Sequence, residues 1–260
     1  MHISEKNWIN KNNIIKFFIF FSTILIVLNF YQFVFERSFA QYTDWLINYQ
    51  GGFVRRGFVG ELLFRIYQIF NIPLDVVVFI FVSILYVFFG IFFIKIIESI
   101  KLSYLNYFLI FSPLSFFYPV MEQKVSGRKD ILFLFAMSFL AIFLEKIKFD
   151  KQKYVIIFFI ALLTLSHSGF FFYTPFLFLI YLLVNHKTNL KKLSLNLSFI
   201  ILTTLFLFIT TILNSNIDLN AINKICESIG PYINSCAENN YIATLNWTLK
   251  YEMSLVDELW

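Results

Sequence analysis

The sequence IIKFFIFFSTILIVLNFYQFV, residues 14–34, carries a single charge, that of Lys16. A bilayer core of about 30 Å takes about 20 helical residues, so this run is long enough to cross a membrane. It lacks a small-residue cleavage site. We therefore expect a retained signal anchor and not a signal peptide that is removed.

Six further apolar runs follow, separated by polar breaks. They cover about residues 74–94, 103–120, 131–144, 154–168, 170–185 and 194–213. The whole chain is 59% hydrophobic and 14% charged, whereas about a quarter of the residues of a soluble domain are charged. We predict an all-α, polytopic transmembrane helix bundle of about seven spans. The two runs that meet at 167–169 form either two spans or one re-entrant hairpin.

The lysines indicate the orientation of the bundle. With a cytoplasmic N-terminus, seven crossings place twelve of the sixteen lysines on the cytoplasmic side, as the positive-inside rule favours. The same assignment places all five arginines outside: Arg37, Arg55, Arg56, Arg65 and Arg128. We expect a multi-pass protein of the bacterial inner (plasma) membrane with an extracytoplasmic C-terminus.

The chain divides into a transmembrane domain, residues 1–213, and an extracytoplasmic tail, residues 214–260. An outer loop and an interfacial helix occupy residues 35–73 of the first domain. Residues 61–71 have helical apolar spacing with one polar side, which is typical of a helix in the headgroup layer. The tail holds both cysteines, Cys226 and Cys236. They form either a disulfide in an oxidising compartment or two unrelated thiols.

The first outer loop contains DWLINYQGGFVRRGFVGE, residues 44–61, with half of the glycines in the chain. Glycines allow a backbone to turn sharply and approach a partner closely, and the guanidinium groups of Arg55 and Arg56 match phosphate or carboxylate. We predict an anion-binding loop here that includes Gln50. The alternative is a tight connection whose arginines touch lipid headgroups.

Two more polar segments fall on the same outer side. In the segment around Gly127, Ser126 can cap a helix and Asp130 favours its first turn. Arg128 and Lys129 are unfavourable for the helix dipole there, so an anionic ligand would explain them better. His167 is either a satisfied helix end or a hydrogen-bond donor or proton shuttle for a ligand.

The motifs of several other functions are missing. The sequence has no metal-ligand spacing, no nucleophile motif and no phosphate-binding P-loop, so we predict no metal and no cofactor. The pI is near 9.0, and most of the basic residues behind it are those expected on the cytoplasmic side of a membrane protein. No nucleic-acid partner is therefore expected. No span carries a charge at its centre, which counts against an ion-coupled transporter.

This layout resembles the membrane glycosyltransferases of the GT-C type. The resemblance implies a lipid-phosphate-linked sugar donor held by basic residues on the outer face. Asp44 takes the place of that family's catalytic acid, ten residues after the first span, and Arg55, Arg56, Arg128 and Lys129 match its phosphate-binding residues. The family often has two adjacent acidic residues there and more spans, whereas this chain has Asp44 alone.

The expected function is therefore transfer of a sugar from a polyprenyl-phosphate carrier in surface glycan, polysaccharide or lipid glycosylation. Asp44 is the predicted catalytic residue, and the predicted substrate-binding residues are Gln50, Arg55, Arg56, Arg128, Lys129 and His167. The partners are the lipid-linked donor and membrane lipids. The alternatives are an O-antigen or exopolysaccharide polymerase, and a non-enzymatic carrier or membrane subunit that binds an anionic lipid.

Overall fold

The computed structural model describes residues 6–36, 40–112, 116, 118–213, 219–233, 242 and 245. Every regular element in these residues is a helix, as predicted. Three helices are long and apolar enough to cross a membrane, and they indicate a membrane protein. They are α1 (Lys6–Glu36), α4 (Leu74–Ser99) and α11 (Leu190–Leu213). In the most apolar stretch of each helix, only 33%, 39% and 22%, respectively, is buried within the protein. Most of the surface of these three helices therefore faces outward.

The other predicted runs form shorter helices. The run 131–144 is α8 (Asp130–Phe143), and the runs around 167–169 are α9 (Phe149–Ser166), the 3₁₀ helix η2 (Ser168–Tyr173) and α10 (Thr174–Val184). His167 separates α9 from η2 with an extended backbone, φ −162° and ψ 115°. The break that polar residues predicted at this position is therefore present.

The predicted span 103–120 is not one helix. It begins as α5 (Tyr104–Phe111) and is followed by α6 (Tyr118–Met121) and α7 (Gln123–Ser126). Ser112 ends α5 in an extended conformation, and the next residue in the sequence is Pro113. Proline disfavours the helical conformation in the residue before it and lacks an N–H for the helix ladder, which explains the stop.

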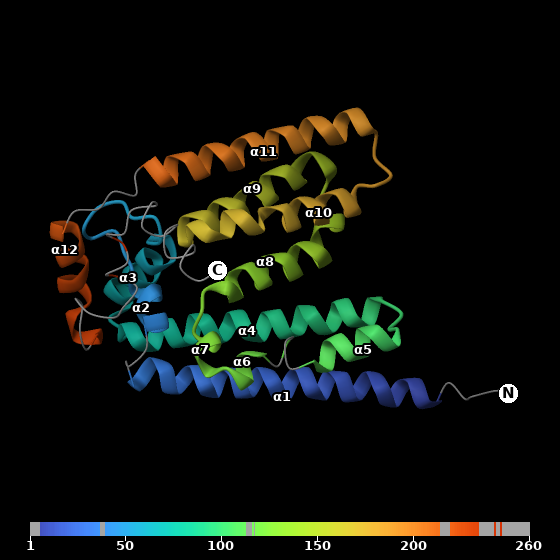
Figure 1. Cartoon of the computed structure of the whole chain (residues 1–260), viewed down its shortest axis with the longest axis horizontal. Helices are drawn as coiled ribbons and strands as arrows, with labels where there is room; N and C mark the ends of the chain where they lie inside the picture. Colours follow the sequence, from blue (N-terminus) through green and yellow to red (C-terminus); the bar gives the residue numbers. More distant parts are fainter. Residues whose placement is uncertain are drawn as a thin grey trace, which may run out of the picture.

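The helices lie side by side and give the bundle two unlike ends (Figure 1). α4 packs between α1 and α8, and α9 packs against α11 and α3 (Phe58–Phe70). One end carries α2 (Ala40–Leu46), α3, the start of α8 and α12 (Leu219–Ile229), together with Arg55, Arg56, Arg65 and Arg128. The opposite end carries the lysine-rich connections α8–α9 and α10–α11. Arg37 lies outside the described residues. The four described arginines thus share one end of the bundle, where Lys129 and Lys224 of α12 also lie, and the side of the membrane that each end faces stays a prediction.

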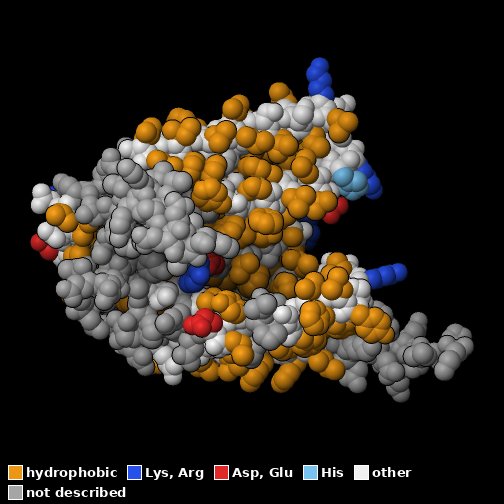
Figure 2. Space-filling view, in the orientation of Figure 1, with side chains coloured by type: hydrophobic (Ala, Val, Ile, Leu, Met, Phe, Trp, Pro, Cys, Tyr) orange, Lys and Arg blue, Asp and Glu red, His pale blue; other side chains and the backbone are white. Residues whose placement is uncertain are grey.

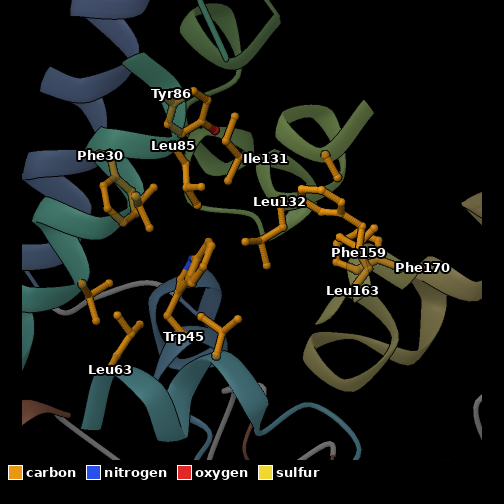
Figure 3. Close-up of a cluster of buried hydrophobic side chains, with 14 of the residues drawn as sticks. Phe30, Trp45, Leu63, Leu85, Tyr86, Ile131, Leu132, Phe159, Leu163 and Phe170 are labelled. Atoms are coloured by element: carbon orange, nitrogen blue, oxygen red, sulfur yellow. The ribbon is translucent and has the colours of Figure 1, made fainter. Parts of the chain in front are cut away.

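Trp45 anchors the arginine-bearing end to the bundle. Its side chain is fully buried between α3, α4 and α8, beside Leu63, Leu85 and Leu132 (Figure 3). Its indole Nε1–H donates to the carbonyl of Gly127 at 2.7 Å. A buried tryptophan contributes both a large apolar area and a directional bond, so α2 is held in a fixed position relative to the start of α8.

The glycine-rich loop is closed by tight packing. A Cβ on Gly60 would lie 1.9 Å from the carbonyl oxygen of Ile47, so only glycine lets α3 approach the end of α2 this closely. The Glu61 carboxylate accepts from the backbone N–H of Tyr49 at 2.9 Å and from Arg65 Nε at 2.6 Å. These bonds fix the loop on the first turn of α3.

The predicted helix over 61–71 is present as α3, which begins three residues earlier. It ends at Asn71, a left-handed cap with φ 52°, and Pro73 follows two residues later. In the glycine-rich loop between α2 and α3, Asn48 Nδ2 donates to Ser228 Oγ of α12 at 2.9 Å. The first part of the tail therefore packs directly on the glycine-rich loop.

Candidate functional site

A polar cavity of about 120 Å³ opens at the arginine-bearing end of the bundle. Its walls come from α2, the start of α8, the α9–η2 break and η2. The lining side chains are acidic, basic, amide and aromatic: Gln41, Asp44, Arg128, Lys129, Asp130, His167, Phe170 and Tyr173, with the backbone of Gly169. Three segments far apart in sequence, residues 41–44, 128–130 and 167–173, thus bring ionisable groups to one place.

Helix geometry explains how α2 places one side chain in the core and its neighbour in the cavity. Asp44 and Trp45 are neighbours in α2, and successive residues of a helix point about 100° apart. Trp45 enters the core while Asp44 lines the cavity. Gln41 lies one turn before Asp44 and therefore shares its face.

Asp44 and Lys129 form the inner pair of the cavity. Lys129 Nζ lies 3.4 Å from Asp44 Oδ1, and the two side chains are 1% and 8% exposed. The same Nζ donates to the backbone carbonyls of Arg56 at 3.0 Å and Ser166 at 3.2 Å. The ammonium is therefore enclosed by two carbonyls that accept hydrogen bonds and by a carboxylate oxygen at ion-pair distance. Burial lowers the pKa of Lys129, and the nearby Asp44 carboxylate opposes that shift.

Arg128 and Asp130 form the outer pair at the cavity edge. Arg128 Nε lies 2.7 Å from Asp130 Oδ2, with side chains 53% and 39% exposed. Burial raises the pKa of Asp130, and the Arg128 guanidinium beside it lowers it. Because only Nε of Arg128 is used in this ion pair, the rest of its planar group can bind an anion.

The start of α8 was predicted in part. α8 begins at Asp130, which lies in the first turn as expected. Ser126 does not cap it, because Ser126 belongs to α7 and three residues separate it from α8. Its backbone carbonyl instead accepts from the Tyr86 hydroxyl at 2.9 Å, which ties the loop before α8 to α4.

His167 reaches the cavity from the α9–η2 break. Its Nδ1 accepts from the backbone N–H of Gly169 at 3.1 Å. Burial, together with the cations of Arg56, Lys129 and Arg128, lowers the pKa of His167 to about 4, and the Asp44 carboxylate opposes that shift. At neutral pH this imidazole is uncharged.

An apolar groove of about 440 Å³ meets the polar cavity at the outer pair. Arg128 and Asp130 line both spaces. The rest of the groove comes from α1, α4, α6, α7, α8 and the connection before α6: Ile26, Tyr86, Phe89, Phe93, Phe116, Tyr118, Pro119, Val125, Ile131 and Leu134. Figure 2 shows hydrophobic side chains over the outer faces of the helices and a hollow between them with charged side chains at its edge. A charged head and an apolar chain of one molecule could occupy the two spaces together.

The structure separates the predicted site residues into two sets. Asp44, Arg128, Lys129 and His167 line the polar cavity. The other three predicted residues do not line it: Gln50, Arg55 and Arg56. Gln50 Nε2 donates to the Glu61 carboxylate at 3.3 Å, and Arg55 is buried. Arg56 supplies its backbone carbonyl to Lys129 and its positive charge to the surroundings of His167.

The sequence reasoning missed Gln41, Phe170 and the Ser166 carbonyl as parts of the site. The spacing of three between Gln41 and Asp44 on a helix would have indicated a shared face. No pattern in the sequence indicates that the Ser166 carbonyl accepts from Lys129.

The remaining predictions concern metal ligands and the disulfide. Among the described residues, no three His, Cys, Asp or Glu side chains come together as a metal site. Cys226 is disulfide-bonded, and its predicted partner Cys236 lies outside the described residues.

Comparisons of this chain with protein-family models, with curated proteins and with solved structures find no match.

Proposed function

We propose that this protein is an integral membrane glycosyltransferase that uses a polyprenyl-phosphate-linked sugar donor at the arginine-bearing end of the bundle. The observation that carries the proposal is the junction of the polar cavity and the apolar groove at Arg128 and Asp130. The donor has the matching two-part chemistry, an anionic phosphate attached to a long apolar chain. The groove would take the start of the chain and the cavity would take the phosphate.

The size of the cavity limits what it holds. Pockets that enclose drug-sized molecules measure about 300 Å³ or more, whereas the polar cavity measures about 120 Å³. A phosphate with the reacting part of one sugar is therefore a better match than a complete glycan. The rest of the sugar and the acceptor would lie in the cavity opening, near Tyr173 and Gln41.

The residues support a direct displacement. Asp44 would accept the proton of an acceptor hydroxyl while that oxygen forms a bond to the anomeric carbon of the donor. The bond from this carbon to the phosphate oxygen would break at the same time, with inversion, and polyprenyl phosphate would leave with its negative charge. Arg128 would stabilise that charge from the cavity edge, and Lys129 would hold the Asp44 carboxylate in place from behind.

The proposal includes the membrane topology. Seven crossings with a cytoplasmic N-terminus would place the cavity on the extracytoplasmic side of a bacterial inner membrane. α3 would lie in the headgroup layer, because its exposed side carries Leu62, Ile69 and Phe70. Reporter cysteines at Gln50 and at Lys187 should then react with an impermeant reagent from opposite sides, and reaction from the same side would contradict the topology.

Glycan transfer by the purified protein tests the function. Wild-type protein in nanodiscs, given polyprenyl-phosphate-linked sugar and an acceptor glycan or lipid, should release polyprenyl phosphate. Per folded molecule, Asp44→Asn should lower transfer by about 100-fold or more while keeping donor binding. Asp150→Asn is the matched control, because Asp150 is exposed on the first turn of α9 at the other end of the bundle. Release of a lipid pyrophosphate would instead identify a polysaccharide polymerase.

A non-enzymatic anionic-lipid carrier or membrane subunit is the second candidate. The inner pair favours it, because an Asp44 carboxylate beside a buried ammonium is a less available proton acceptor than a free one. In that case Asp44→Asn would leave lipid binding unchanged and Arg128→Ala would weaken it. Absence of turnover in the wild type, together with an unaffected Asp44→Asn variant, would reject the glycosyltransferase.

A further inference from the structure

His167 has one ring nitrogen that is hydrogen-bonded to the backbone, and the residue lines the polar cavity. The extended backbone at His167 turns the imidazole back over Gly169, whose N–H donates to Nδ1 at 3.1 Å. A Cβ on Gly169 would lie 3.0 Å from both Nδ1 and Cε1. The glycine therefore lets this edge of the ring pack against the backbone.

The hydrogen bond from Gly169 fixes the tautomer of His167. A backbone N–H can only donate, so Nδ1 must carry its lone pair and the single proton of the neutral ring must reside on Nε2. Within the described part of the chain, no residue hydrogen-bonds Nε2, and the ring lines the polar cavity. The Nε2–H group is thus a donor that a ligand can use.

The charges around His167 keep the ring neutral. Among the residues that the structure describes, Asp44 is the one acidic group that acts on the ring, against the cations of Arg56, Arg128 and Lys129. Asp130 also lines the cavity and is paired with Arg128. Partial burial disfavours a charge on the ring as well. Burial and the net positive surroundings therefore both oppose a second proton.

We propose that His167 recognises the anionic head of the ligand through a permanent Nε2–H donor, and that it does not accept a proton in the reaction. The identity of the ligand rests on the proposed function, whereas the tautomer does not. A group that only donates selects for an oxygen lone pair at the ligand, so it favours a phosphate head and disfavours an ammonium head. Together with Arg128, it gives the cavity two donors that the described protein groups do not fully use.

Nuclear magnetic resonance of the full chain in nanodiscs, with ¹⁵N-labelled histidine, tests the tautomer directly. The chain has three histidines, so the variants His2→Gln and His186→Gln assign the spectrum. Without ligand, His167 should show a protonated Nε2 and an unprotonated Nδ1 from about pH 8 to about pH 5. Farnesyl phosphate should move the Nε2–H resonance of His167 and leave that of His186 unchanged. Farnesol is the control without the anion and should move it less.

Two substitutions separate the two nitrogens. An asparagine side chain is the shorter mimic of Nδ1, so His167→Asn keeps an acceptor for Gly169 and loses the distant donor. His167→Gln places an amide donor near the Nε2 position and loses the acceptor. We expect about 10-fold weaker farnesyl phosphate binding for His167→Asn and less than about 3-fold for His167→Gln. A purely structural histidine would give the reverse order, because the turn at Gly169 would then be the feature that matters.

Each result decides between the alternatives. A protonated Nδ1, or a ring that gains its second proton near pH ~6.5, would overturn the proposal whatever the transfer assay shows. So would an unchanged His167 resonance while farnesyl phosphate binding is detected by calorimetry. If the spectrum and the variants behave as expected but no sugar is transferred, the glycosyltransferase is rejected and the donor role of His167 stands for an anionic-lipid-binding protein.

Discussion

The inner and outer pairs of the cavity use consecutive cations in opposite ways. Lys129 is buried and pairs with Asp44 from another helix, whereas Arg128 is half-exposed and pairs with Asp130 two positions along the chain. Buried ion pairs are costly to break because the remaining charge has no water, and exposed pairs contribute about 0–1 kcal/mol. The inner pair is therefore the structural one, and the outer pair is free to exchange its partner for a ligand.

The largest effect should come from removing one member of the inner pair. Lys129→Met leaves the Asp44 carboxylate buried without a cation, and we expect a loss of about 3–5 kcal/mol in the free energy of unfolding. Chemical unfolding in detergent measures this. The double variant Asp44→Asn with Lys129→Met should recover part of the loss. The control is Lys148→Met, because Lys148 is exposed at the other end of the bundle. Equal stability of Lys129→Met and wild type would contradict the claim that the inner pair stabilises the fold more than the outer pair does.

His167, which lines the same cavity, should make stability depend on pH. The folded pKa of His167 is lowered to about 4, below the value of about 6.5 expected in the unfolded chain. Between these values the unfolded state takes up a proton that the folded state does not, so stability falls as the pH drops from about 6.5 to about 4 and this contribution then stays constant. The loss is at most about 3 kcal/mol. The free energies of unfolding of wild type and His167→Asn, compared at pH about 6.5 and about 4, isolate the contribution of His167. An identical pH dependence in the two proteins would contradict the lowered pKa of His167.

The inner pair should also depend on the anchor of α2. Trp45→Phe removes the donor to the Gly127 carbonyl and leaves a small void, for an expected cost of about 1–3 kcal/mol. Because Gly127 precedes both cations, the substitution should weaken the coupling between Asp44 and Lys129 measured in a double-mutant cycle. Coupling that is unchanged in the Trp45→Phe background would show that the pair forms independently of the anchor.

The smallest change in stability should come from the outer pair. Arg128→Ala should alter the free energy of unfolding by less than about 1 kcal/mol, yet weaken farnesyl phosphate binding by about 10-fold because a charged donor is lost. Added salt should reduce wild-type binding more than binding by the variant. A large loss of stability with unchanged binding would mean that the two pairs have the reverse roles.

The sequence predicted much of the helix layout because hydrophobicity and helix-ending residues act locally. The apolar spacing over residues 61–71 predicted α3, and the break at His167 falls where two apolar runs were expected to meet. The failure over 103–120 came from treating an apolar run as one helix although Pro113 interrupts it. Ser126 was expected to be a cap because its residue type suits one, but it belongs to α7, one residue before Gly127.

The site was less predictable, because its key contacts depend on tertiary packing. Asp44, Arg128, Lys129 and His167 were selected from residue type and the expected side of the membrane, and the fold brings them to one cavity. The sequence does not say that Lys129 is enclosed by two backbone carbonyls and a carboxylate, while Arg128 is left half-exposed. That difference arises because neighbouring residues at the start of α8 point in different directions.

The contact between the glycine-rich loop and α12 has a consequence for biogenesis. Asn48 and Ser228 are 180 residues apart, and Gly51 lies close to Ala221 in the same helix. A ribosome releases the loop long before it has made either partner. The loop therefore lacks these contacts while the intervening helices are translated and inserted, and the segment that supplies the Arg56 carbonyl to Lys129 gains its last packing partner only after α12 has been made.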